Sequence, residues 1–296
     1  MLETIKLDKV AIIGVGLLGG SIGLALRAAG FSGQRVGIGR RASSLRKALD
    51  CDAVDEVTQD VAKGVGDAQL VVLCTPIGHF ETLLRQLGPA LSPGTYVTDV
   101  ASTKTTVVQI AHRLLPKTVR FVGSHPMAGS EKMGVEFARA DLFERALCVL
   151  TPTPRTDPST IRWMRSFWET LGAHTATVTP KQHDILLARV SHLPHAVATA
   201  LVQLSLRGSA IDFAGPGFAD VTRIASGDPN MWTDIFRTNR KAMMQGIDQL
   251  ITELTKLRGR LERDDEKAIH DWLEAGKNAR DQWIAKRYKQ KKVLPP

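Results

Sequence analysis

Two kinds of hydrophobic pattern divide the chain. Over the first 178 residues, short apolar runs typical of buried strands are separated by stretches in which apolar residues recur at helical spacing. The runs lie at 10–13, 35–39, 70–76, 96–102, 120–124, 146–151 and 174–178. Strands that alternate with helices predict a doubly wound, mainly parallel sheet. Ligands of such sheets bind at the carboxyl ends of the strands.

From residue 179 onward the pattern is that of long amphipathic helices, and no convincing strand appears. Helical spacing covers 180–207, 228–263 and 265–284. We therefore predict a Rossmann-type α/β domain over 1–178, followed by an all-α domain over 179–296. Helices of this length bury one face against other helices or against a second subunit, so we expect a homodimer through the helical domain.

A glycine-rich turn follows the first predicted strand and opens the first predicted helix. Gly14 permits the tight turn, Gly16 lets the backbone approach a pyrophosphate, and Gly19 lets helix and strand pack closely. The alternative is a turn selected for packing alone, but the strand before it and the helix after it favour a dinucleotide site. The cofactor contacts that we expect are Gly14, Val15, Gly16, Leu17, Leu18 and Gly19, with Thr75 and Pro76 at the end of a neighbouring strand.

The residues after the second predicted strand bear on the choice of cofactor. An NAD-binding domain typically has an acidic residue roughly 20 residues beyond the glycines, where it binds the ribose 2′-hydroxyl. Gly39, Arg40 and Arg41 occupy that region here. Two guanidinium groups suit a 2′-phosphate, although two exposed loop arginines are the alternative. We predict NADP as the cofactor, with NAD as the second choice.

Composition limits the class of protein. With 296 residues and 43% hydrophobic content, the chain is long enough for two domains with cores of their own. No apolar run suggests a membrane span and the N-terminus does not resemble a signal peptide, so we expect a cytoplasmic protein without a membrane partner. Cys51, Cys74 and Cys148 lack the spacing of a metal site or a disulfide framework, and we interpret them as reduced, mostly buried thiols.

The net charge of +9 requires an explanation. Basic residues are dispersed, apart from a run between Lys286 and Lys292. That run lacks the interleaved aromatic residues of a single-strand binder, so we interpret it as a solvated tail and expect no nucleic-acid partner. A basic protein that binds an anionic cofactor and an anionic substrate accounts for the remaining charge.

Two polar clusters follow predicted strands of the first domain. His125 lies just past a strand end, and a neutral imidazole suits removal of a hydroxyl proton as hydride departs. A structural loop histidine is the alternative. In the other cluster, Ser102 is suited to bind a substrate hydroxyl or the nicotinamide ribose, and Lys104 to bind an anion. The alternative is that Ser102 or Thr103 caps the following helix.

A third cluster lies in the helical region. His192 and His195 are three residues apart, but no cysteine or carboxylate completes a ligand set at usable spacing, so we predict no metal. Arg223 follows a Gly-Pro-Gly-Phe break. Its planar guanidinium suits a carboxylate, with a bond worth about 1.5–3 kcal/mol, and a surface or ion-paired arginine is the alternative.

Together these clusters resemble the prephenate and arogenate dehydrogenases of tyrosine biosynthesis, over nearly the whole chain. The segments that carry the resemblance are Thr-Asp-Val-Ala-Ser-Thr-Lys at 98–104, Gly-Ser-His-Pro-Met-Ala-Gly-Ser-Glu at 123–131, Ser-His-Leu-Pro-His at 191–195, Phe-Ala-Asp-Val-Thr-Arg-Ile-Ala at 218–225 and Asp-Pro-Asn-Met-Trp at 228–232. The resemblance implies a nucleotide-binding domain followed by a helical domain that makes the dimer.

The resemblance also implies residue roles. His125 matches the histidine that takes the proton from the ring hydroxyl of the substrate, and Ser102 matches a serine that binds the same hydroxyl and the cofactor. Arg223 matches the arginine that binds a substrate carboxylate, and His195 matches a second active-site histidine. The remaining polar matches, which line or gate the site in relatives, are Ser191, Glu131, His183 and Asp220.

The reaction implied is oxidative decarboxylation of prephenate to 4-hydroxyphenylpyruvate. The same chemistry on arogenate, which makes tyrosine directly, is the alternative. The pair Arg40 and Arg41 resembles the NADP-using members, several of which prefer arogenate, whereas His195 resembles the prephenate users. More distant alternatives are a β-hydroxyacid dehydrogenase or imine reductase, and a non-catalytic protein that senses the cofactor.

Overall fold

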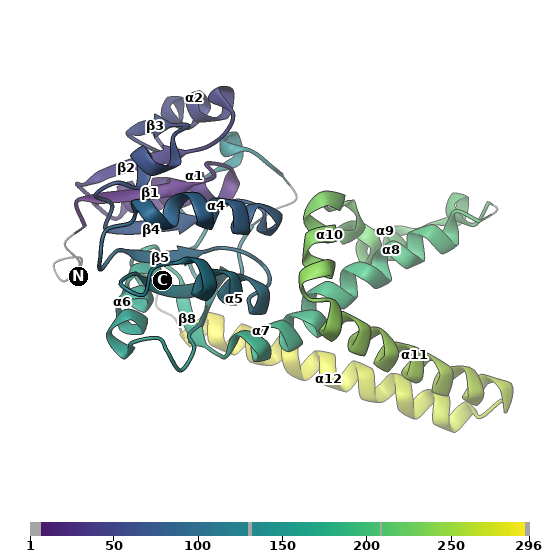
Figure 1. Cartoon of the computed structure of the whole chain (residues 1–296). Helices are drawn as coiled ribbons and strands as arrows, with labels where there is room; N and C mark the ends of the chain where they lie inside the picture. The colour runs from purple at the N-terminus through teal and green to yellow at the C-terminus, as the bar shows by residue number, and fades with distance from the viewer. Residues whose placement is uncertain (1–6, 130–131, 208, 294–296) are drawn as a thin grey trace. The chain divides into compact units, whose positions relative to one another are not determined.

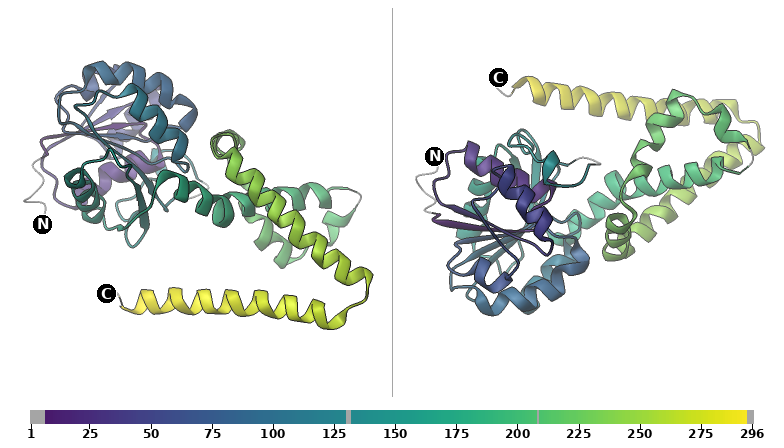
Figure 2. Two further views of the ribbon diagram at one scale, coloured as in Figure 1. Left: turned by 60° about the horizontal axis from the view of Figure 1, so that its bottom comes forward. Right: turned by 90° about the horizontal axis from the view of Figure 1, so that it is seen from above.

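The computed structural model describes residues 7–129, 132–207 and 209–293, with side chains as far as Lys286. Its contacts divide the chain into two compact units, Met1–Met243 and Met244–Pro296. The first unit contains a sheet with helices on both faces, followed by a helical segment (Figures 1 and 2). The second unit is helical.

Eight strands of the described residues form one sheet in the order β3-β2-β1-β4-β5-β6-β7-β8. All neighbours from β3 to β6 are parallel, β7 is antiparallel to β6, and β8 is parallel to β7. The strands are β1 (Lys9–Ile13), β2 (Gln34–Ile38), β3 (Glu56–Thr58), β4 (Leu70–Leu73), β5 (Tyr96–Asp99), β6 (Arg120–Pro126), β7 (Leu147–Thr151) and β8 (His174–Thr177). The predicted mainly parallel sheet is confirmed. Because β2 and β4 lie on opposite sides of β1, the topological switch point is at the carboxyl end of β1.

Helices on both faces of the sheet enclose two apolar cores. One face carries α1 (Leu17–Ala28), α2 (Ala42–Asp50) and α6 (Pro158–Thr170), and the other carries α3 (Val61–Val65), α4 (Phe80–Leu87) and α5 (Thr105–Leu114). Val10 and Ile12 of β1 enter the first core, and Ala11 and Ile13 enter the second. Successive strand residues point to opposite faces, so a strand covered on both faces is apolar throughout.

The helical segment of the first unit begins at a capping box. The Thr179 hydroxyl accepts from the backbone N–H of Gln182, and the Gln182 side chain accepts from the backbone N–H of Thr179. The helices are α7 (Pro180–Leu187), a π-helical segment (Ala188–His192), α8 (Leu193–Ser205), α9 (Pro216–Thr222) and α10 (Pro229–Thr238). A π-helical segment inside an α-helix is frequently found at a functional site.

Three structural expectations were wrong. The edge strand β3 was missed because its three residues are exposed or half-buried and form no apolar run. The helix expected over 228–263 is two helices, α10 and α11 (Arg240–Glu262), because Asn239 leaves the helical conformation at φ −110° and ψ 25°. The cysteines are not mostly buried, since Cys51 is exposed and Cys74 is half-buried.

The expectation about membrane spans also needs a correction. Among the described residues, the helix Pro180–Ser205 is long and apolar enough to cross a membrane by length and composition alone. It carries the buried side chains of His183, Asp184, His192 and His195, which contact other parts of the first unit. These contacts attach the helix to the rest of the first unit, and a single helix of this kind is weak evidence for a membrane span.

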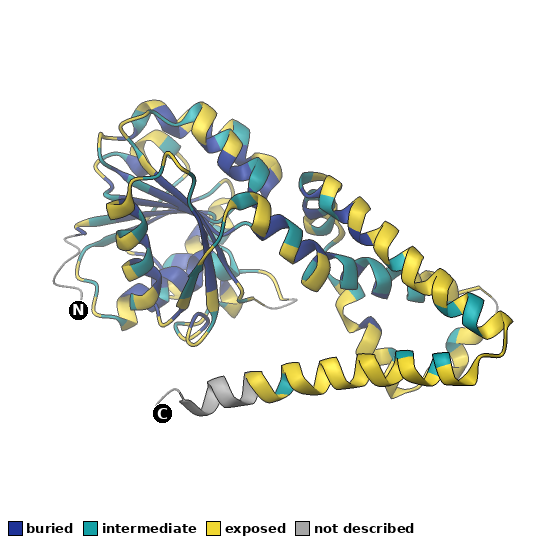
Figure 3. Ribbon diagram, turned by 90° about the horizontal axis from the view of Figure 1, so that it is seen from below, coloured by how far each residue is buried: buried dark blue, intermediate teal, exposed yellow. Residues whose placement is uncertain are grey.

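The second unit consists of most of α11 and of α12 (Glu266–Val293). A turn joins the two helices, and Asp264 in it has φ 51°. Most of the described residues of this unit are exposed (Figure 3). The exposed residues include the large apolar side chains of Met244, Ile247, Ile251, Leu254, Leu261 and Leu273. Several exposed apolar side chains on one element are typical of a surface that binds another subunit.

The contact of α1 with the chain after α2 gives a stability prediction. A Cβ added at Gly23 would lie 1.9 Å from the Ala53 carbonyl oxygen. We expect Gly23→Ala to lower the free energy of unfolding by about 1–3 kcal/mol, as overpacking does. Denaturant unfolding measures this. Gly217→Ala is the control, because beyond the neighbouring backbone of its own helix no described atom lies within 4 Å of a Cβ there. Equal stability of the two variants would contradict the prediction.

Candidate active site

The glycine turn lies at the switch point of the sheet. Gly14 has φ 95°, which strongly favours glycine, and a Cβ there would lie 2.7 Å from the Cys74 carbonyl oxygen. A Cβ at Gly19 would lie 2.1 Å from the Gly14 carbonyl oxygen, so α1 packs directly on the turn. Apart from its own chain neighbours, no described atom lies within 4 Å of a Cβ built on Gly16, the N-cap of α1. The open space at the helix N-terminus fits a phosphate group.

The surroundings of the turn also fit a dinucleotide. Thr75 follows β4, and its buried hydroxyl oxygen has no hydrogen-bond partner among the described residues. A buried polar atom without a partner is unfavourable unless a ligand or water satisfies it. Val15 is buried, Leu17 and Leu18 are half-buried, and Pro76 is exposed.

Arg40 and Arg41 lie at the carboxyl end of β2, and both are exposed. Arg41 is the N-cap of α2, and its side chain makes no capping hydrogen bond. The Arg40 guanidinium approaches the His79 ring, with 3.3 Å between Nη2 and Nε2. The Arg40 carbonyl oxygen accepts from the Gln59 amide at 2.5 Å, which anchors the loop backbone.

His125 lies near the carboxyl end of β6 and is 8% exposed. Its Nδ1 lies 2.9 Å from Nε2 of His183, and Nδ1 of His183 lies 2.9 Å from Oδ1 of Asp184. The Asp184 carboxylate also accepts the backbone N–H groups of Lys104 and Thr105, each at 2.8 Å. The structure thus joins an imidazole of β6 to a carboxylate of α7 through a second imidazole.

Asp184 takes the place of a local cap on α5. The N-cap of α5 is Lys104, which makes no side-chain capping bond, so neither Ser102 nor Thr103 caps the helix. Thr103 instead forms a hydroxyl pair with Thr238 at 2.8 Å. A carboxylate at a helix N-terminus is stabilised by the free N–H groups and the helix dipole.

A buried ion pair lies beside this cluster. The side chains of Lys104 and Asp99 are fully buried and form an ion pair, and the Lys104 ammonium also donates to the Ser124 carbonyl at 2.7 Å. Burial raises the pKa of Asp99 and lowers the pKa of Lys104, and their mutual attraction opposes both shifts. Protein groups therefore enclose the ammonium. It is not accessible to an anionic ligand, contrary to the role suggested from the sequence.

Burial keeps the histidines of the cluster neutral. It lowers the pKa of His125 well below the usual range, and the neighbouring His183 and Lys104 lower it further. Burial also lowers the pKa of His183, and the hydrogen bond that His183 donates to Asp184 opposes this shift. The pKa of Asp184 is lowered because its hydrogen bonds from His183, Thr105 and Lys104 outweigh burial.

His192 and Asn239 extend the cluster across the helical segment. The Asn239 amide donates to the Asp184 carbonyl at 2.7 Å and lies 3.1 Å from Nδ1 of His192. Because the amide nitrogen is a donor, Nδ1 of His192 accepts, and Nε2 carries the proton. That buried Nε2 has no hydrogen-bond partner among the described residues.

His195 is buried and stacks on Trp232, with ring centroids 3.6 Å apart. Its Nδ1 has no partner among the described residues. Burial lowers its pKa, and a hydrogen bond with the Ile224 backbone opposes the shift. His195 therefore lies next to the turn Arg223–Ser226 that follows α9.

The other predicted site residues are placed as follows. Ser191 is half-buried in the π-helical segment, and Ser102 is half-buried in the loop between β5 and α5. Arg223 ends α9, as its position after the break suggested, and it is exposed. Asp220 is also exposed, and Glu131 lies outside the described residues. The structure brings His125 and His195 into one cluster. The contacts that connect them run through His183, Asp184, Asn239, His192 and Trp232.

Sequence reasoning missed the partners that hold these histidines. Asp184 and Asn239 were not singled out, and His183 was weighed only as a gating residue. The available signal was a pair of adjacent polar residues on the first helix after the sheet, just past the Thr179 capping box. Asn239 was hidden because it lies inside what reads as one continuous helical pattern.

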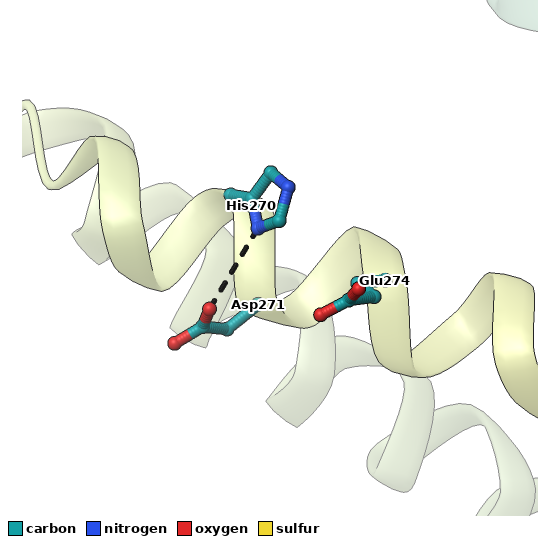
Figure 4. Close-up of side chains that lie close together, drawn as sticks. All are labelled: His270, Asp271 and Glu274. Atoms are coloured by element: carbon teal, nitrogen blue, oxygen red, sulfur yellow. Dashed lines mark ion pairs between the residues drawn. The ribbon is translucent and has the colours of Figure 1, made fainter.

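His192 and His195 were also considered for a metal. Among the described residues, three side chains of types that can bind a metal lie close together on α12. They are His270, Asp271 and Glu274 (Figure 4). All three are exposed, and the Asp271 carboxylate already pairs with the Lys267 ammonium at 2.6 Å. Exposed groups on one helix do not form a built metal site.

The fold and the cluster define a class of protein. A nucleotide-binding turn lies at the switch point, and a buried neutral histidine lies at the carboxyl edge of the same sheet. This combination is that of a nicotinamide-dependent dehydrogenase with a helical second part.

Two family models match the chain. Residues 22–177 match "Prephenate dehydrogenase, nucleotide-binding domain", and residues 179–275 match "Prephenate dehydrogenase, dimerization domain". The prephenate dehydrogenase of Bacillus subtilis (strain 168) is 34% identical over 93% of this chain and 76% of its own length. The chain belongs to the prephenate dehydrogenase family, whose members are oxidoreductases.

Solved structures give the same result. The prephenate dehydrogenase of A. aeolicus, in complex with hydroxyphenyl propionate and NAD+, is 35% identical, with a TM-score of 0.90 over 94% of this chain and 99% of that one. The arogenate dehydrogenase of Synechocystis is 33% identical, with a TM-score of 0.82 over 93% and 99%. The predicted α/β domain followed by a helical dimerisation domain is therefore confirmed, as is a nicotinamide cofactor.

The buried His192 gives a prediction for the pH dependence of stability. Burial lowers its pKa from 6.5 to about 4, so the unfolded chain binds the proton more strongly than the folded protein. This contribution to stability is complete above pH 6.5 and is lost as the pH falls to about 4. We expect a loss of about 3 kcal/mol over this window.

Denaturant unfolding at a series of pH values measures the effect. His192→Gln should give a flatter profile between these pH values, because glutamine does not titrate. His174→Gln, at an exposed residue of β8, is the control and should keep the wild-type slope. A wild-type slope in His192→Gln would show that His192 does not cause the pH dependence.

Proposed function

We propose that this protein is a prephenate dehydrogenase that oxidises and decarboxylates prephenate to 4-hydroxyphenylpyruvate, with NADP as the hydride acceptor. The observation that carries the proposal is His125, a buried neutral imidazole whose Nδ1 is already bonded to His183. Its other ring nitrogen remains for a substrate. The name of the Bacillus subtilis relative supports the same substrate.

His125 has the properties of a general base for this reaction. A bound oxidised nicotinamide would supply the acceptor for a hydride from the carbinol carbon of the substrate. His125 takes the hydroxyl proton at Nε2, so the carbinol oxygen can form a carbonyl. The ring carboxylate leaves as carbon dioxide, and the ring becomes aromatic. Ser102, half-buried in the neighbouring β5–α5 loop, is proposed to hydrogen-bond the same hydroxyl.

The substrate carboxylates require donors on the helical side. We assign His195 and Ser191 to the substrate, because His195 has a buried ring nitrogen without a described partner. Arg223 is exposed and adjacent to the backbone that bonds His195, which suits a carboxylate clamp. Glu131 retains its assignment from the sequence resemblance.

Arogenate is the second candidate substrate. The structural relative named as an arogenate dehydrogenase is nearly as similar to this chain as the prephenate dehydrogenases are. His195 favours prephenate, because the resemblance associates a histidine at this position with the prephenate users. If the protein turned over arogenate but not prephenate, arogenate would replace prephenate as the proposed substrate.

The choice of NADP rests on Arg40 and Arg41. Both guanidinium groups are exposed at the end of β2, where an NAD-binding domain would place a carboxylate. The prephenate dehydrogenase of A. aeolicus binds NAD+ in its solved structure, which makes NAD the alternative cofactor for this protein. The arginine pair and the uncapped N-terminus of α2 favour the additional phosphate in this one.

We further propose a cytoplasmic homodimer that assembles through the helical part, with the domain boundary near residue 178. The match to a dimerization domain over 179–275 supports this assembly. The exposed apolar side chains of the second unit supply a surface that a second copy would cover.

Turnover tests the proposed reaction. The wild-type protein, assayed with prephenate and arogenate and with each cofactor, should have its highest kcat/KM with prephenate and NADP. His125→Asn should lower kcat by about 10²–10⁴-fold and leave KM nearly unchanged, because the base acts in the transition state. His174→Asn is the exposed control. A wild-type kcat in His125→Asn would remove His125 from the mechanism.

Cofactor preference has a separate test. Arg40→Ala combined with Arg41→Ala should raise KM for NADP by about 10-fold or more and change KM for NAD little, since the lost bonds are to the 2′-phosphate. Arg46→Ala, at an exposed arginine later in α2, is the matched control. Equal weakening of both cofactors would contradict a 2′-phosphate contact.

A further inference from the structure

Two hydrogen bonds connect His125 to Asp184 through His183, and the Asp184 carboxylate determines which atom donates in each. The Asp184 carboxylate accepts two backbone N–H groups at the N-terminus of α5, so it is ionised and has no proton to donate. Nδ1 of His183 must therefore donate to Asp184. Neutral His183 then has a bare Nε2, which can only accept, and Nδ1 of His125 must donate to it.

We propose that His183 and Asp184 are positioning residues that hold the proton of His125 on Nδ1 and leave its Nε2 bare to act as the base. This proposal rests on the proposed function and specifies how that site is set up. It also gives His183 a role different from the gating role that the sequence resemblance suggested.

The hydrogen-bonded path from His125 through His183 to Asp184, which we call the relay, has a second effect during the reaction. The O–H bond of the substrate hydroxyl breaks and an N–H bond forms at Nε2, so His125 becomes a cation. The hydride goes to the oxidised nicotinamide nucleotide, and carbon dioxide leaves. The Asp184 carboxylate lies one imidazole away from the new cation and stabilises it across His183.

Other charged and titratable groups also surround His125. The Lys104 ammonium opposes the new cation, and its buried partner Asp99 offsets it. A protonated His192 would lower the pKa of His125, and the Cys148 thiol lies on the neighbouring strand β7. Asp184 is distinguished from these groups because a continuous hydrogen-bonded path joins it to the His125 ring.

Two substitutions of His183 separate positioning from packing. His183→Gln can place its amide oxygen where Nε2 lies, so Nδ1 of His125 keeps an acceptor while the path to Asp184 is lost. His183→Leu removes the acceptor as well. We expect His183→Leu to lower kcat by about 10²–10³-fold, with KM for substrate and cofactor within about threefold of the wild type. We expect His183→Gln to keep kcat within about tenfold.

The pH profile of kcat gives the readout that packing would not move. Without the carboxylate behind it, His125 should be a weaker base. The acidic limb of the profile should therefore move to lower pH by about one unit in His183→Gln, while the plateau falls. His174→Leu, the same change at an exposed histidine, should leave both kcat and the limb unchanged.

Two outcomes would overturn the relay. One is a wild-type kcat in His183→Leu. The other is an equal loss in both variants with an unmoved acidic limb, which would mean that His183 acts by packing alone. If His183→Leu does not fold, the limb of His183→Gln still decides.

The tautomer of His125 can also be measured without turnover. Nitrogen-15 NMR of the full-length protein should show a protonated Nδ1 and a bare Nε2 in the His125 ring, and His183→Leu should lose this preference. A wild-type protein that has this tautomer but turns over neither prephenate nor arogenate would refute the proposed function and keep the relay. The opposite tautomer in an active wild type would refute the relay alone.

Discussion

The carboxylate of Asp184 is the interaction on which the site depends. It accepts two backbone N–H groups at the start of α5, so one side chain of α7 is bonded to the sheet domain at two points, and it also accepts a ring N–H of its neighbour His183. The backbone carbonyl of the same residue accepts from Asn239. Loss of this anion would leave a helix end uncapped and an imidazole without its partner, which couples local stability to the chemistry.

The site also depends on the neutrality of a crowded set of imidazoles. Burial lowers the pKa of His125, His183, His192 and His195, and the enclosed ammonium of Lys104 adds to this at His125 and His183. A protonated imidazole could not accept a proton, so burial maintains the form that the base requires. Burial of the ion pair formed by Lys104 and Asp99 is unfavourable by itself. The hydrogen bond from the Lys104 ammonium to the Ser124 carbonyl helps to compensate for this cost.

Most of the fold could be predicted because its signals are local. Apolar runs marked seven of the eight strands in the described part of the chain, and the turn from Gly14 to Gly19 marked the switch point. The short edge strand β3 and the break at Asn239 could not be found, since neither changes the hydrophobic period. His125 could be named from its position near the end of a strand, although it lies within β6 and not in the loop expected after residue 124. Its orientation could not be predicted, because that depends on Asp184 about 60 residues away in the chain.

The same electrostatics bear on how an anionic substrate would act in this site. A carboxylate that enters beside buried neutral imidazoles favours their protonated forms and raises their pKa. The dicarboxylate proposed here would therefore make His125 more basic when it is bound than when it is absent. The base is then weakest in the free protein, where Lys104 and burial suppress protonation, and strongest in the complex in which the proton must be taken. The bare Nε2 that Asp184 and His183 maintain is the atom on which this increase acts.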